Sequence, residues 1–292
     1  MAIDKLQEKI RKVKNPTVVD LCVCAAQVPP HILEEEETLI RAYGRFYHEL
    51  LSALKGVVPA VRFSLGHFSL LGPDGLSLLH DVTYLAKEQG FYVFLDGPES
   101  LSALSAVSGA DALFAEKCPW WFDALVVSAY AGSDVLKPYV SRLKESKKDL
   151  FVVLRTANKS ASELQDLLSG SRLVYMAAAD KVSRQGVELI GRSGYSQVAG
   201  VGPASSADSL RNLREKYKNL FLLIDGYDYS NSNAKNCSFA FDKLGHGAIA
   251  CAGSGITAAW DTDTSEGTDY IAQVVEAAER MKKNLLRYIT VL

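Results

Sequence analysis

The sequence of 292 residues lacks a charge excess of either sign, with 32 basic and 34 acidic residues and a pI near 6.2. Such a balance provides no broad attraction to a nucleic-acid backbone or an anionic membrane surface. The sequence also lacks any run of about 18 apolar residues, the length that a membrane-spanning helix needs. We therefore expect neither nucleic acid nor a membrane as a partner.

Cysteine and histidine are scarce, which argues against disulfides and metal. The cysteines are Cys22, Cys24, Cys118, Cys237 and Cys251, an odd and scattered set that is typical of reduced thiols. The histidines are His31, His48, His67, His80 and His246, and none of them has HxH or HxxxH spacing. No metal site is expected. Residues 1–15 carry charges and no apolar core, so they do not resemble a secretory signal, and a cytoplasmic location is expected.

Short apolar, β-branched runs recur along the chain and predict strands. They are Val18–Cys24, Val58–Leu65, Phe91–Leu95, Ala124–Ala129, Leu150–Arg155, Val198–Gly202, Leu220–Asp225 and Gly247–Ala252. Helical patterns alternate with them over Ile32–Leu54, Leu76–Gln89, Leu101–Glu116, Asp134–Ser146, Ser160–Leu168, Leu173–Ser193, Ser206–Tyr217, Ala234–Leu244 and Glu266–Ile289. Eight strand–helix units predict a parallel sheet covered by helices.

At this length, eight such units favour a closed (β/α)8 TIM barrel over an open sheet. No linker interrupts the alternation, so residues 1–292 are expected to form a single domain. An extra N-terminal helix, Ile3–Val13, is expected to cover the bottom of the barrel. Active sites of this fold lie where the strands end, so the loops after each predicted strand are the segments to search for chemistry.

Seven segments then resemble one known family in their order and spacing. They are NPTVV from Asn15, GPDGL from Gly72, AYAGSDVLKPYV from Ala129, LRTANKSASELQDL from Leu154, GVGPAS from Gly200, FLLIDGYDYSN from Phe221 and GAIACAGSGITAAW from Gly247. Together they resemble the longer bacterial type of orotidine 5'-monophosphate decarboxylase over nearly the whole chain.

The resemblance implies a homodimeric TIM barrel and a lyase of pyrimidine biosynthesis that needs no cofactor. Members convert orotidine 5'-monophosphate to uridine 5'-monophosphate. That chemistry requires a lysine to protonate the carbanion, carboxylates that hold the lysine, and donors for the phosphate.

The third-strand loop departs from the family's Asp-x-Lys-Arg-x-Asp motif. The motif falls on Asp96 to Leu101, and only Asp96 matches it. Pro98 stands at the lysine position and has no ionisable proton, so it cannot act as a general acid. Leu101 stands where the family has a second carboxylate that reaches across the dimer interface.

Other family positions are changed as well. Cys22 stands at a carboxylate position of the first strand, and Arg62 replaces a lysine near the ribose. Ala157 stands at a serine that contacts the pyrimidine, although Asn158 beside it is kept. Ser230 stands at the glutamine of the phosphate loop, in a segment that also contains Tyr227.

The phosphate end loses its charge. Ser254 stands at the phosphate-binding arginine, and a serine cannot replace a guanidinium fork. Asp225 and Asp228 would repel a dianion. The amides of Gly253 and Gly255 are left as a weak anion site.

Several residues also have structural interpretations. Asp96 fits the cap of a turn, and Arg62 fits a salt bridge with Asp96 or Asp20. Two apart on one strand, Cys22 and Cys24 fit buried thiols on the same side. The cluster from Cys118 to Phe122 fits packing against the barrel or a partner patch. The run Glu34–Glu37 fits a solvated helix start.

The favoured hypothesis is a family member without normal decarboxylase activity, acting as a binding or regulatory protein that dimerises with itself or with an active homologue. One alternative is an enzyme of changed specificity that uses Asp96, Arg62 or Cys22. Another is an active decarboxylase with a rearranged site, although Lys87 and Lys117, the nearest lysines, lie on or just after predicted helices rather than at the end of a strand. Only Asp96 is a retained catalytic candidate, and the predicted pocket-lining residues are Cys22, Arg62, Asp96, Pro98, Leu101, Ser105, Ala157, Asn158, Asp225, Tyr227, Ser230, Gly253, Ser254 and Gly255.

Overall fold

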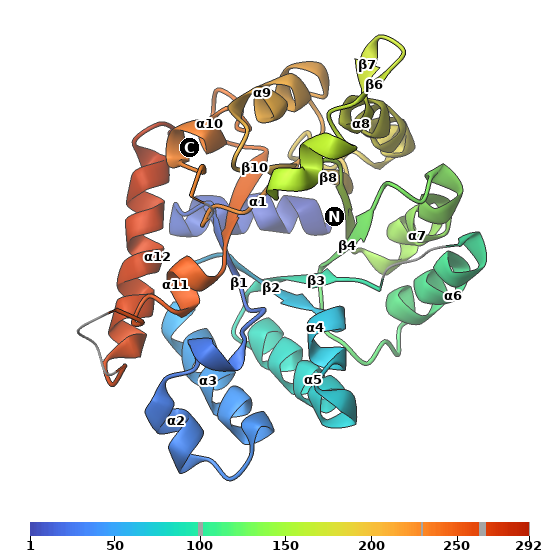
Figure 1. Cartoon of the computed structure of the whole chain (residues 1–292). Helices are drawn as coiled ribbons and strands as arrows, with labels where there is room; N and C mark the ends of the chain where they lie inside the picture. The colour runs from blue at the N-terminus through green and yellow to red at the C-terminus, as the bar shows by residue number, and fades with distance from the viewer. Residues whose placement is uncertain (99–101, 229, 263–266, 292) are drawn as a thin grey trace.

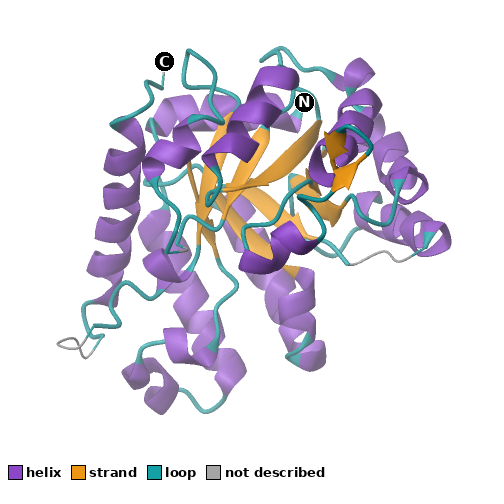
Figure 2. Ribbon diagram, turned by 45° about the horizontal axis from the view of Figure 1, so that its top comes forward, coloured by secondary structure: helices purple, strands orange, loops and turns teal. Residues whose placement is uncertain are grey.

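The computed structural model describes residues 1–98, 102–228, 230–262 and 267–291. Eight parallel strands close into a barrel in the order β1-β10-β9-β8-β5-β4-β3-β2, and helices surround it (Figures 1 and 2). The strands are β1 (Thr17–Asp20), β2 (Ala60–Ser64), β3 (Tyr92–Asp96), β4 (Ala124–Ser128), β5 (Asp149–Val153), β8 (Val198–Pro203), β9 (Leu222–Asp225) and β10 (Ala248–Ala252). The predicted TIM barrel is confirmed.

The α-helices are α1 (Ala2–Val13), α2 (Pro30–Glu35), α3 (Leu39–Leu54), α4 (Leu65–Ser69), α5 (Gly72–Glu88), α6 (Ala103–Phe114), α7 (Ser133–Ser146), α8 (Val174–Gln185), α9 (Ala207–Lys216), α10 (Ala234–Ser238), α11 (Ser254–Thr257) and α12 (Tyr270–Leu286). The described residues also form three 3-10 turns, Ala25–Gln27, Lys159–Glu163 and Val187–Leu189, and a hairpin of β6 (Leu168–Ser169) and β7 (Arg172–Leu173). Within the described part of the chain, every helix is too short or too polar to cross a lipid bilayer.

Each barrel strand is buried on both sides because successive side chains point to opposite faces. On β2, Ala60 belongs to the cluster inside the barrel, whereas Val61 and Phe63 belong to the layer between strands and helices. Tyr92 and Phe94 of β3 likewise point inward. This alternation fixes which residues at the strand ends face the barrel axis.

Helix α1 closes the amino-terminal end of the barrel, as predicted for the extra helix (Figure 1). Its apolar side Ile3, Leu6 and Ile10 is fully buried against the interior cluster. The Gln7 side chain also accepts a hydrogen bond from the backbone amide of Gly247, just before β10, at 3.1 Å. The opposite, carboxyl-terminal end of the barrel is the mouth.

Strand β1 is shorter than predicted and does not include the two cysteines. The Asp20 carboxylate accepts the backbone N–H of Cys22 at 3.0 Å, a local turn that leads the chain away from the sheet. Cys22 is half-buried and Cys24 is exposed. The prediction that both are buried on one side of a strand is therefore wrong.

The predicted helix Ile32–Leu54 is two helices. Glu36 has extended backbone angles and ends α2, and the Thr38 side chain accepts the amide of Arg41 to begin α3. Glu34 and Glu35 thus lie at the end of a short helix rather than at the start of a long one. Two other predicted helices are longer than the observed elements. The pattern over 160–168 corresponds to the 3-10 turn Lys159–Glu163, and the pattern over 234–244 corresponds to the short helix α10.

Candidate functional site

Four charged side chains meet at the barrel mouth because each stands two residues after an inward-facing one. Val18, Ala60, Phe94 and Leu223 lie in the interior cluster, so Asp20, Arg62, Asp96 and Asp225 face the axis one layer higher. The sheet register sets Asp20 beside Arg62 on the neighbouring strand. The strand ends thus form a charged layer over an apolar barrel interior.

Arg62 is the centre of this layer. Its Nε and Nη2 donate to the two carboxylate oxygens of Asp96 at 2.8 and 2.7 Å, and its Nη1 donates to Asp225 at 2.8 Å. A carboxylate oxygen of Asp20 lies 3.7 Å from Nη1, and Cys251 Sγ lies 3.9 Å from it. The guanidinium is therefore already paired with carboxylates from three other strands, β1, β3 and β9.

Burial and charge act in opposite directions on these groups. Burial disfavours the charged form of Arg62, but the carboxylates of Asp96, Asp225 and Asp20 raise its pKa above the ordinary value. Burial raises the pKa of Asp96, although the contact with Arg62 lowers it. An incoming anion would have to compete with carboxylates that already occupy the guanidinium.

The Gly253 and Gly255 amides are not free, contrary to the prediction of a weak anion site. One carboxylate oxygen of Asp228 accepts both, at 2.5 Å from Gly253 N and 3.2 Å from Gly255 N. A Cβ on Gly255 would lie 2.7 Å from the other oxygen, so glycine permits this close approach. Asp228 thus places a carboxylate of the chain itself on these donors.

Cys22 lies beside the charged layer. Burial raises the pKa of its thiol, and the carboxylates of Asp20 and Asp96 raise it further. The nucleophilic form of cysteine is the thiolate. Its surroundings therefore disfavour thiol chemistry at Cys22.

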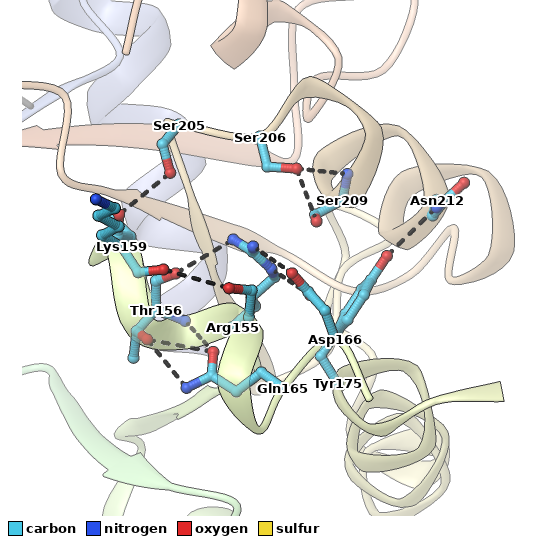
Figure 3. A network of polar contacts seen from close by, with 12 residues as sticks. Arg155, Thr156, Lys159, Gln165, Asp166, Tyr175, Ser205, Ser206, Ser209 and Asn212 are labelled. Carbon is cyan, nitrogen blue, oxygen red and sulfur yellow. Dashed lines mark hydrogen bonds and ion pairs between the residues drawn. The ribbon is translucent and has the colours of Figure 1, made fainter. Parts of the chain in front are cut away.

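A second arginine after a barrel strand is also paired (Figure 3). Arg155, just beyond β5, donates to both oxygens of Asp166 at 2.7 Å. The Gln165 side chain accepts the amide of Thr156 at 2.8 Å, which holds the segment 156–166 against the strand end. The second cation is thus neutralised locally, like the first.

The other predicted lining residues take varied places. Pro98 is exposed, Leu101 lies outside the described residues, and Ser105 is an exposed capping residue of α6. Three of the remaining candidates are exposed: Asn158, Ser230 and Ser254. Ala157 is buried, and its carbonyl accepts a hydrogen bond from the Ser205 hydroxyl. Tyr227 is half-buried and packs against the layer between strands and helices.

Comparison with known proteins now places the chain. The model of the family described as "Orotidine 5'-phosphate decarboxylase / HUMPS family" matches residues 110–265, more than half of the chain. The chain belongs to this family. The resemblance in the seven sequence segments is thereby confirmed at the level of the family.

Relatives that match over most of their own length are named orotidine 5'-phosphate decarboxylase. An orotidine 5'-phosphate decarboxylase of Rhodopirellula baltica is 29% identical over 254 residues, covering 84% of each chain. One of Clostridium botulinum is 26% identical over 286 residues, covering 98% of this chain and 99% of its own. The solved Leishmania donovani OMP decarboxylase has a TM-score of 0.72 at 21% identity, covering 98% of this chain and 99% of its own, which supports the fold.

Sequence reasoning missed two features of the mouth. Asp20 stands at the end of the first predicted strand and is expected to pair with Arg62, but it is not among the predicted lining residues, although its spacing from Val18 indicates that it faces the axis. Lys159, in the 3-10 turn after β5, is an exposed lysine beyond a strand end that the pattern did not single out.

Proposed function

We propose that this chain is a family member that does not decarboxylate orotidine 5'-monophosphate and that serves as a binding or regulatory protein. The observation that carries the proposal is that the polar groups of the mouth are paired with one another. Arg62 is held by Asp96 and Asp225, and the amides of Gly253 and Gly255 are held by Asp228.

Charge supports the same proposal. Asp20, Asp96 and Asp225 surround one guanidinium, and Asp228 lies close enough to Asp20 and Asp225 for their charges to interact, so carboxyl groups outnumber the guanidinium in this layer. Orotidine 5'-monophosphate carries a phosphate and a carboxylate, and like charges in a partly buried site repel each other. The substrate would have to displace these internal ion pairs.

The missing proton donor supports it as well. The family's resemblance sets Pro98 at the position of the lysine that protonates the product carbanion, and a proline has no proton to give at any pH. Loss of a positioned general acid removes about 10²–10⁴-fold of rate. The electrostatic arrangement that the family requires is changed at the same time.

An active decarboxylase with a rearranged site is the alternative, and the names of the relatives favour it. In that case another cation must supply the proton. Lys159, exposed after β5, is the lysine placed to be tested for that role.

Turnover distinguishes the two functions. Purified protein is assayed for conversion of orotidine 5'-monophosphate to uridine 5'-monophosphate, with the Clostridium botulinum relative as the positive control. We expect a rate at the level of the blank. A rate within about a hundredfold of the relative would overturn the proposal, and its loss in Lys159→Met would assign the proton donor.

The proposal includes a dimer, either with itself or with an active homologue, supported by the resemblance to a homodimeric family. Co-expression with a tagged active homologue, followed by affinity purification and size exclusion, tests the mixed dimer. Recovery of this chain with the homologue supports it. Elution of each protein only with itself excludes the mixed dimer.

A further inference from the structure

A groove of about 740 Å³ lies on the outside of the barrel, far from the mouth. It is bounded by the last turns of α5, α6 and α7 and by the loop 115–123, at the amino-terminal ends of β4 and β5. Its size is within the ordinary range of small-molecule sites, about 300–1,000 Å³. None of the residues discussed at the mouth lines it.

The walls of the groove are aromatic and fixed in place. Phe114, Trp120, Trp121 and Phe122 line it, and Trp121 is 47% exposed. The amide of Trp121 donates to Thr83 Oγ1 at 3.2 Å, and its ring meets the ring of Tyr84 edge-on at 5.5 Å. An exposed indole held in this way offers a flat apolar surface without a large cost in ordering.

Two of the three cations in the groove are neutralised. Lys87 is paired with Asp123 at 2.6 Å, and Arg142 is paired with Asp111. Both pairs join neighbouring elements of the wall. These two cations are therefore committed to the structure of the groove.

Lys148 is the third cation, and among the residues that the structure describes no carboxylate forms an ion pair with it. Its Nζ lies 3.6 Å from the centre of the Phe122 ring and donates to the carbonyl of Leu113 at 3.0 Å. Burial lowers the pKa of Lys148, whereas the charge of nearby Asp123 acts in the opposite direction. Charged groups inside proteins are ordinarily paired, so this one offers a place for an anion.

We propose that the groove binds a planar aromatic monocarboxylate. The carboxylate accepts from Lys148 Nζ, and the ring system packs on Trp120 and Trp121. Glu116 and Glu145 also line the groove, and their charge disfavours a ligand with a second anionic group. The site is independent of the proposed function of the mouth.

The test uses 2-naphthoate as the probe, followed by tryptophan fluorescence and by calorimetry. We expect saturable binding to the unmodified protein. The neutral alcohol with the same rings, 2-naphthalenemethanol, should bind about tenfold more weakly, because a hydrogen bond to a charged group contributes about that factor.

Variants then assign the anion to one side chain. Lys148→Met should weaken naphthoate binding about tenfold, and Lys148→Arg should retain most of it. Lys144→Met is the matched control on α7, since Lys144 does not line the groove and is 65% exposed. Melting temperatures check that each variant is folded.

Two results would overturn the proposal. One is no saturable binding of naphthoate up to about 1 mM, the weak end of specific affinity. The other is equal affinity for the alcohol and the acid, or for the folded Lys148→Met variant and the unmodified protein, because binding would then not depend on the cation.

Discussion

Replacement of Arg62 by methionine tests the charged layer of the mouth. Methionine keeps a long apolar stem but leaves the carboxylates of Asp96, Asp225 and Asp20 facing each other without a cation. Removing one partner of a buried ion pair costs about 3–5 kcal/mol. The three acidic side chains are 22–33% exposed, so we expect the lower end, about 3 kcal/mol.

The loss should depend on pH in a defined direction. Burial already raises the pKa of Asp96 in the presence of Arg62, and removal of the cation raises it further. A carboxyl group with a raised folded pKa contributes stability at low pH that is lost as the pH rises through that pKa. The gap between variant and unmodified protein should therefore be smallest near about pH 5 and full at about pH 8.

Urea denaturation at the two pH values measures this gap, with the slope of the transition as a check on its two-state form. Arg62→Met combined with Asp96→Asn is the matched control, because it removes the cation together with its bidentate partner. The combined variant should recover part of the lost free energy of unfolding. A loss below about 1 kcal/mol, or one equal at both pH values, would refute the electrostatic account.

Three further predictions concern single side chains. Asp228→Ala removes the acceptor of two backbone amides and should lower the free energy of unfolding by about 1–2 kcal/mol in urea titrations. The control is Asp208→Ala on α9, where the Asp208 side chain is 85% exposed. No change would mean that water replaces the carboxylate. Asp149 is fully buried and accepts a hydrogen bond from Tyr92 Oη at 2.7 Å. Burial raises the pKa of Asp149, so its contribution to stability is lost as the pH rises. Asp149→Asn should therefore flatten the decline of melting temperature between about pH 5 and pH 9, and an unchanged slope would contradict this. Iodoacetamide at about pH 7.5 should modify exposed Cys24 well before Cys22, whose thiol is held in the protonated form, as read by peptide mass spectrometry; equal rates would contradict the raised pKa.

The fold could be predicted because its signals are local. Runs such as Ala124–Ser128 and Ala248–Ala252 are apolar along their whole length, as strands buried on both faces are. The inward side of each strand also follows from the two-residue period, which puts Arg62 and Asp96 at the mouth. Family membership followed from the order of segments spread over the chain.

The pairing at the mouth could not be predicted, because it depends on distances between loops. Asp228, in the loop after the neighbouring strand, accepts the amides of Gly253 and Gly255, which lie 25 and 27 residues further along the chain. The sequence contains an acidic residue and two glycines at these positions. It does not reveal that the Asp228 carboxylate accepts the backbone amides of both glycines. The end of β1 could not be predicted for the same reason. The Asp20 carboxylate accepts the backbone amide of Cys22 in a turn after the strand, and Cys24 beyond this turn is exposed rather than buried.

The central claim is that the polar groups at the mouth already form hydrogen bonds and ion pairs with one another. Binding of uridine 5'-monophosphate tests this claim most directly. Calorimetric titration of the purified protein, with the Clostridium botulinum relative titrated under the same buffer and salt, measures it without requiring catalysis. The account predicts no saturable heat for this chain at nucleotide concentrations up to about 1 mM. Saturable binding in the micromolar range would contradict it, because the nucleotide phosphate would then have found donors that the structure assigns to Asp228 and Arg62's carboxylate partners.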